Sequence, residues 1–172
     1  MMPSATRARA PEFISPTFIR AIAILAAIYV SFLAMEAVHE FGHALNAWSS
    51  GGRVVDVRFP LLGTSQTVVD PNPYPRFVAE GGPQWGIVIP LLACGLAHLT
   101  RRRVPEPLKF FAGFCLIVNG IYMGVGPAWR NTDASDLIRM NVPLGAIFAY
   151  GIGATACGLA IWHRLSWLTW KR

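Results

Sequence analysis

The sequence predicts an all-α membrane protein with about four transmembrane helices and a small β-hairpin or interfacial loop between the first two. Three observations support this fold class. Of the 172 residues, 53% are hydrophobic and 14% are charged, whereas soluble domains carry about 25% charged residues. The apolar residues gather in runs long enough to cross a bilayer. Basic residues flank those runs. We therefore expect a single membrane-embedded domain over residues 1–172.

The first predicted span covers residues 18–48 and is the longest. At about 1.5 Å per residue, roughly 30 helical residues extend about 45 Å, which exceeds the hydrocarbon core of roughly 30 Å. The polar segment from His39 to His43 lies deep in this run, so we place it near the far edge of the bilayer. Gly51 and Gly52 then end the helix.

The segment 53–80 has the pattern of a hairpin. Residues 54–59 are rich in β-formers, residues 63–65 read as a turn, and residues 67–69 can return the strand. The prolines that follow, at positions 71, 73 and 75, favour an extended path.

Three further spans are predicted at residues 84–99, 108–126 and 143–163. The second is short for a crossing, so we expect Gly81-Gly82-Pro83 to begin a re-entrant or partly sunk segment. No nucleic-acid partner is expected, because the basic residues flank the spans and form no stripe with interleaved aromatics.

The distribution of basic residues predicts a topology. Ten of the 15 Lys and Arg residues fall on one side of the four spans and five on the other. Because the richer side faces the cytoplasm, we expect a multi-pass protein with both termini cytoplasmic. The His39–His43 segment and the loop 127–142 then lie together on the outer side.

Residues 39–43 read His-Glu-Phe-Gly-His. Side chains four residues apart share one face of a helix, so the two imidazoles can bind one metal ion. Glu40 can reach a water on that metal without being a ligand. Zinc brings the pKa of such a water near 7, and the carboxylate accepts its proton. The pattern therefore predicts a zinc site with His39 and His43 as ligands and Glu40 as general base.

Zinc in a catalytic site needs a third protein ligand and an open fourth position. Position 49 is a serine, which excludes the extended metzincin pattern. Asp133 and Asp136 follow the third span at the same membrane face as the histidines, and Glu80 lies in a loop rich in proline and glycine. All three remain candidates, although the aspartates could instead cap a helix that starts near Ser135.

Two further polar residues are candidates for roles around the metal. Glu36 lies one turn before His39 and can orient a ligand histidine. Asn119 lies inside the third span, where its amide can bind substrate backbone or an oxyanion, or else bond to a neighbouring helix. The predicted hairpin can also offer a strand edge to an unwound substrate.

At these positions the chain resembles the site-2-protease family of membrane-embedded zinc metalloproteases. The stretch from His39 to Leu45, with the glycines that follow it, looks like that family's first motif. The segment Glu80-Gly81-Gly82-Pro83 is similar to its glycine-rich middle element. Asn119, Pro127 and Asp133 are similar to its third motif, in which an asparagine and a proline precede a metal-binding aspartate.

This resemblance covers roughly residues 20–140 and leaves no room for a PDZ-like insertion. It implies Zn²⁺ held by His39, His43 and Asp133, with Glu40 as the catalytic residue. The activity it implies is intramembrane endopeptidase cleavage in or near transmembrane segments of membrane-protein substrates in the lipid bilayer.

The chain departs from the family in two ways. Ala134 follows Asp133 where the family commonly has glycine, so Asp136 stays an alternative ligand. Well-known members also place zinc toward the cytosol, opposite to the orientation that the basic residues predict. Two other functions stay open: a non-catalytic metal-binding scaffold for a partner, and a different membrane zincin that uses Glu80 as third ligand.

Overall fold

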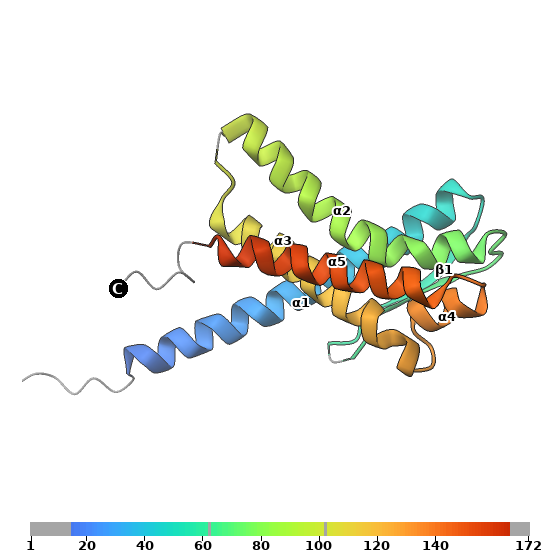
Figure 1. Cartoon of the computed structure of the whole chain (residues 1–172), viewed down its shortest axis with the longest axis horizontal. Coiled ribbons are helices and arrows are strands. Elements are labelled where there is room, and N and C mark those ends of the chain that lie inside the picture. The colour runs from blue at the N-terminus through green and yellow to red at the C-terminus, as the bar shows by residue number, and fades with distance from the viewer. Residues whose placement is uncertain (1–14, 62, 102, 166–172) are drawn as a thin grey trace, which may run out of the picture. The chain divides into compact units, whose positions relative to one another are not determined.

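The computed structural model describes residues 15–61, 63–101 and 103–165, and these alone are discussed below. Figure 1 shows a mostly helical chain with one two-stranded hairpin between its first two helices. Its elements are α1 (Pro16–Ser49), β1 (Val54–Arg58), β2 (Gln66–Val69), α2 (Pro75–Arg101), α3 (Glu106–Val125), the 3₁₀ turn η1 (Gly126–Ala128), α4 (Asp133–Arg139) and α5 (Leu144–His163). The predicted fold class is confirmed.

Four helices in the described residues are long and apolar enough to cross a membrane: α1, α2, α3 and α5. Residues up to Val30 and residues from Ser31 onward form two compact units. All the features described below lie within the second unit.

The end of α1 matches the prediction. Gly51 has a φ of +81°, a left-handed conformation that glycine adopts without strain. The N–H of Gly52 then bonds to Ala47 O at 2.8 Å. Beyond this turn, β1 and β2 pair antiparallel from Val54 opposite Val69 to Arg58 opposite Gln66, with an irregularity after Val54.

Helix α2 starts earlier than expected. It begins at Pro75, nine residues before the predicted start of the second span at residue 84, and runs through Gly81, Gly82 and Pro83. Residues 71–74 before it lie outside the helix. Proline suits the first turn of a helix because the N–H it lacks has no partner there. The glycines serve a close helix contact: a Cβ on Gly81 would lie 2.5 Å from Gly42 O. Gly42 and Gly81 therefore let α1 and α2 touch backbone to backbone.

Helices α3 and α5 also pack through glycine. A Cβ on Gly120 would lie 2.7 Å from Gly151 O, and one on Gly158 would lie 2.7 Å from Gly113 O. Small residues allow such close approach between helices in a bilayer. At one end of this contact, the Trp162 indole donates to Phe110 O at 2.9 Å.

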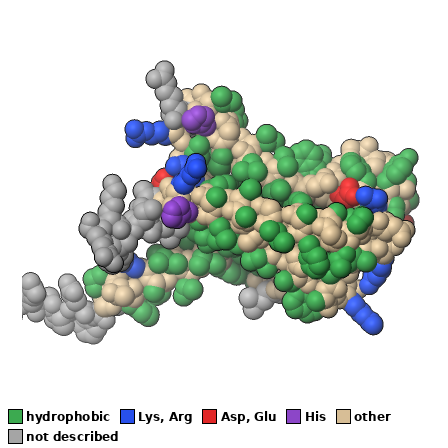
Figure 2. All heavy atoms as spheres, viewed as in Figure 1, with side chains coloured by type: hydrophobic (Ala, Val, Ile, Leu, Met, Phe, Trp, Pro, Cys, Tyr) green, Lys and Arg blue, Asp and Glu red, His purple; other side chains and the backbone are tan. Residues whose placement is uncertain are grey.

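The outward faces of these helices are apolar. Large hydrophobic side chains such as Leu92, Leu96 and Ile152 are each more than 60% exposed. In the view of Figure 2, hydrophobic side chains cover the helices along their length, and Lys, Arg and His gather toward their ends. This distribution is typical of helices that contact lipid, and it agrees with a multi-pass membrane protein.

Candidate metal centre

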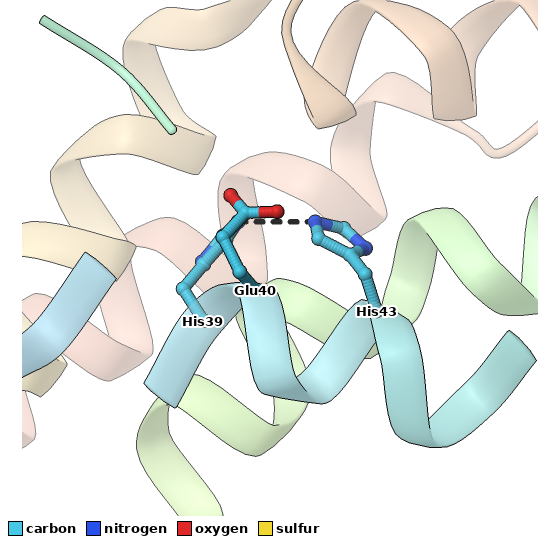
Figure 3. A group of neighbouring side chains, drawn as sticks. All are labelled: His39, Glu40 and His43. Atoms are coloured by element: carbon cyan, nitrogen blue, oxygen red, sulfur yellow. Dashed lines mark hydrogen bonds between the residues drawn. The ribbon is translucent and has the colours of Figure 1, made fainter. Parts of the chain in front are cut away.

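Helix α1 places three buried polar side chains beside one another. His39, Glu40 and His43 are 8%, 3% and 7% exposed, and each offers a ligand atom within 4.8 Å of the others. Figure 3 shows the two imidazoles one turn apart with the Glu40 carboxylate beside them. The two Nε2 atoms face each other at 3.2 Å. This group can hold a metal ion.

Each imidazole is held through its Nδ1 atom. His39 Nδ1 lies 2.8 Å from Asn119 Oδ1, and the Asn119 amide nitrogen donates to Cys115 O, which leaves Oδ1 as the acceptor. His43 Nδ1 lies 2.7 Å from Val78 O. A carbonyl oxygen can only accept, so both Nδ1 atoms carry the proton, and in the neutral form of each imidazole Nε2 is the atom left to bind a metal ion.

One neighbour competes for His43. The N–H of Gly82 lies 3.2 Å from the same Nδ1. The contact with Val78 O is shorter and decides the tautomer, because an Nδ1 that accepted from Gly82 would leave Val78 O facing a lone pair.

The third polar group at this point is Asp133, from α4. Its Oδ2 lies 2.9 Å from His39 Nε2 and 3.4 Å from His43 Nε2. Burial favours a raised pKa at Asp133, but where a proton rather than a cation lies on the facing Nε2 atoms, the hydrogen bonds and charge of the two histidines outweigh burial and hold that pKa well below its usual range. The carboxylate is therefore ionised at neutral pH, as a metal ligand must be.

The start of α4 fixes the position of Asp133. Thr132 is the N-cap: its side chain accepts from Ser135 N–H, and Ser135 bonds back to the Thr132 N–H. Thr132 also donates to Gly126 O at 2.9 Å, which ties α4 to η1. The N–H of Asp133 bonds to the Tyr122 hydroxyl at 3.2 Å. The aspartate is thus the first residue of a capped helix.

The three atoms are close enough together to bind one metal ion. The edges of the triangle that they form measure 2.9, 3.2 and 3.4 Å. In a tetrahedral site with zinc bonds of 2.0–2.2 Å, neighbouring ligand atoms lie roughly 3.3–3.6 Å apart. Two lone pairs and a carboxylate at such distances repel one another unless a cation or a proton lies between them.

Space around this triangle is kept by a glycine. A Cβ built on Gly82 would lie 2.3 Å from His43 Nε2 and 2.5 Å from His39 Nε2. A side chain at this position would collide with both nitrogens. The donor set, the tautomers and this close glycine contact together fit a divalent cation.

The hairpin contacts the other side of the group. Glu40 Oε1 accepts from the Ser65 hydroxyl at 2.7 Å, and Oε2 accepts from the Thr67 hydroxyl at 2.5 Å. Glu36 Oε2 accepts from the Ser65 N–H at 2.6 Å. Glu36, which was expected to orient a histidine, thus bonds from α1 to the residue at the end of the hairpin turn.

The other predicted candidates lie as follows. Asp136 pairs with Arg139 at 2.8 Å and Glu80 with Arg76 at 2.9 Å, each within its own helix. Among the three candidate third ligands, Asp133 is the one with an ion pair to the imidazoles in the described part of the chain. Asn119 bonds to a histidine on a neighbouring helix, so the amide is already engaged.

Three groups that contact the His-Glu-His group from other elements had no predicted role at the site: Val78 O, Ser65 and Thr67. Gly82, which was predicted only as part of a glycine-rich element, also contacts His43. The glycine pair next to Pro83 was a usable signal, because glycines inside a helix mark close approaches. The partners of Glu40 depend on the strand register, which local sequence does not specify.

No protein-family model, curated protein or solved structure matches the chain. The established points are therefore a helical fold with four candidate spans and a buried group that can hold a metal ion.

Proposed function

We propose that the chain is an intramembrane zinc metalloendopeptidase similar to the site-2-protease family. Its ligands are His39, His43 and Asp133, and its general base is Glu40. The observation that carries the proposal is the convergence of three metal-binding atoms within 3.4 Å of one another, next to a carboxylate, among four helices able to cross a membrane.

The residues divide the chemistry between them. When bound, zinc supplies Lewis-acid polarisation of a carbonyl group and an acidified water. The Glu40 carboxylate takes a proton from the water whose oxygen attacks the peptide carbonyl carbon. It then gives that proton to the leaving nitrogen as the C–N bond breaks, so the products are a carboxylic acid and an amine, and the acid's proton passes to the amine to give a carboxylate and an ammonium group.

Asn119 and Val78 act on the ligands. By accepting the Nδ1 protons of His39 and His43, they present both Nε2 lone pairs to the cation. Such partners of ligand histidines contribute about 10–100-fold to metal affinity or activity.

The surroundings favour a membrane-protein substrate. Beside the site, a cavity of about 280 Å³ lies between α1 and the hairpin, lined by Leu33, Glu36, Ala37, Phe59, Pro60 and Leu61. Four of the five β1 residues are exposed, so main-chain groups of the hairpin can bond to a substrate segment that has unwound. The excess of basic residues on one side supports an orientation with cytoplasmic termini.

The test is cleavage in proteoliposomes that contain the zinc-loaded protein and a set of single-span membrane proteins, with new chain ends found by mass spectrometry. Wild type and Glu80→Gln, whose glutamate pairs with Arg76, should cut the same substrate. Glu40→Gln should retain one zinc per chain and lose at least about 100-fold in rate. Cleavage by Glu40→Gln at the wild-type rate contradicts the proposal. Zinc binding without cleavage by wild type would favour a non-catalytic metal protein.

A further inference from the structure

The Glu40 carboxylate is held by the hairpin at both of its oxygens. The Ser65 hydroxyl donates to Oε1 at 2.7 Å and the Thr67 hydroxyl donates to Oε2 at 2.5 Å. Ser65 immediately precedes β2 and Thr67 lies within it. Glu40 is 3% exposed, so water supplies little of the solvation that a buried carboxylate needs.

The hairpin end is itself fastened to the same helix. Glu36, one turn before Glu40 on α1, accepts from the Ser65 N–H at 2.6 Å. The Thr67 hydroxyl also lies 3.3 Å from the main-chain oxygen of Glu40. The carboxylates of Glu36 and Glu40, one turn apart, therefore hold residues 65–67 against α1. The Ser65 and Thr67 hydroxyls each donate one hydrogen bond to Glu40.

We propose that Ser65 and Thr67 are positioning residues for the general base, an inference that rests on the proposed function. A glutamate side chain has three rotatable bonds, and fixing such a side chain costs conformational entropy. The two hydroxyls meet that cost before substrate arrives and keep the carboxylate within 4.8 Å of the imidazole ligand atoms.

The hydroxyls leave the carboxylate able to react. An ionised carboxylate has about four lone-pair sites, and the hydroxyls of Ser65 and Thr67 use one on each oxygen. A site remains on each oxygen to take a proton from water. Both donors are neutral, so neither forms an ion pair with the base.

The decisive variants separate the hydroxyl from the shape of the side chain. Thr67→Val keeps the shape and removes the hydroxyl, whereas Thr67→Ser keeps the hydroxyl. In the proteoliposome assay, Thr67→Val and Ser65→Ala should each lower kcat about 10-fold with KM unchanged, and Thr67→Ser should stay within about twofold of wild type. Thermal unfolding of the loaded variants checks that the fold is retained.

A second readout does not depend on cleavage. Acetohydroxamate chelates a divalent cation and gives its proton to a neighbouring carboxylate. Titrating the Co²⁺-loaded protein with it, followed by visible absorption, therefore reports how well Glu40 is placed. Thr67→Val should weaken acetohydroxamate binding about fivefold or more, while Thr67→Ser should bind it as wild type does.

The outcomes decide between three roles. Equal kcat and equal acetohydroxamate affinity in Thr67→Val and wild type would overturn the proposal and leave the hydroxyls as fasteners of the hairpin. A higher kcat in Thr67→Val or Ser65→Ala would overturn it in favour of a lid over the base. If wild type cleaves nothing, the proposed protease function fails, and the acetohydroxamate titration alone supports or overturns the positioning of Glu40.

Discussion

The two halves of the site are held in different ways. The ligand half, which comprises His39, His43 and Asp133, is fixed by groups that belong to helices: a main-chain oxygen of α2, an amide of α3 and the capped start of α4. The base half, which comprises Glu40, is fixed by two hydroxyls of the hairpin. The positions of the metal ligands therefore depend on helix packing, and the position of the general base depends on the two-stranded hairpin.

This difference has a physical origin. A two-stranded hairpin is at best marginally stable by itself, and β1 is largely exposed. Its placement at the site depends on the bonds to Glu36 and Glu40. Helices α1 and α2, in contrast, meet backbone to backbone at Gly42 and Gly81. Substitutions in one half should accordingly leave the other half intact.

The largest effect should come from the ligand half. His43→Ala and Asp133→Ala each remove a metal-binding atom. We expect zinc affinity to fall by more than about 100-fold, which exceeds the loss expected when a residue that hydrogen-bonds to a ligand is removed. Equilibrium dialysis against Zn²⁺ measures it. Asp136→Ala, which removes the other acidic residue of α4, should bind zinc as wild type does. If Asp136→Ala lost as much zinc affinity as we expect for Asp133→Ala, and Asp133→Ala lost none, Asp136 would be the third ligand.

The next effect tests the close contact between Gly82 and the two Nε2 atoms. Gly82→Ala would put a methyl group 2.3–2.5 Å from both Nε2 atoms, so zinc affinity should fall about 100-fold while Glu40 keeps its hairpin partners. Gly95→Ala is the matched control, because the space around Gly95 in the same helix is open. Unchanged zinc binding by Gly82→Ala would mean that the cation lies elsewhere.

Much of this arrangement is readable from local sequence. The spacing of His39 and His43 predicts the imidazole pair, and the glycines after Ser49 predict the end of α1. The hairpin follows from its β-formers and its turn. Each of these features depends on residues close together in the chain.

What could not be predicted depends on contacts between elements. Asp133 and Asp136 both lie in the first turn of α4, so spacing alone does not choose between them; the Thr132 cap, tied to η1, directs Asp133 to the histidines. The start of α2 was missed because Gly81 and Gly82 look like helix breakers until Gly42 is known to lie against them.

A smaller effect should follow from the partner of His39. Asn119→Ala removes the acceptor of the Nδ1 proton, and zinc affinity should fall about 10–100-fold. A competition titration with a zinc chelator measures this loss. Affinity equal to wild type would show that the Nδ1 bond does not prepare the ligand.

The smallest effect should arise in the base half. Glu36→Gln replaces the charged acceptor of the Ser65 N–H with a neutral one, and charge-assisted bonds are about twice as strong. We expect kcat to fall about threefold with zinc affinity unchanged. A loss of zinc in this variant would show that the two halves are coupled after all.

The most direct test of the central claim is X-ray absorption spectroscopy of the zinc-loaded wild-type protein. The geometry predicts one zinc per chain, bound by two imidazole nitrogens at about 2.0–2.1 Å and by oxygen atoms, one of them from Asp133. A thiolate ligand, a third imidazole or a chain that retains no zinc would contradict the assignment of His39, His43 and Asp133 as the metal ligands.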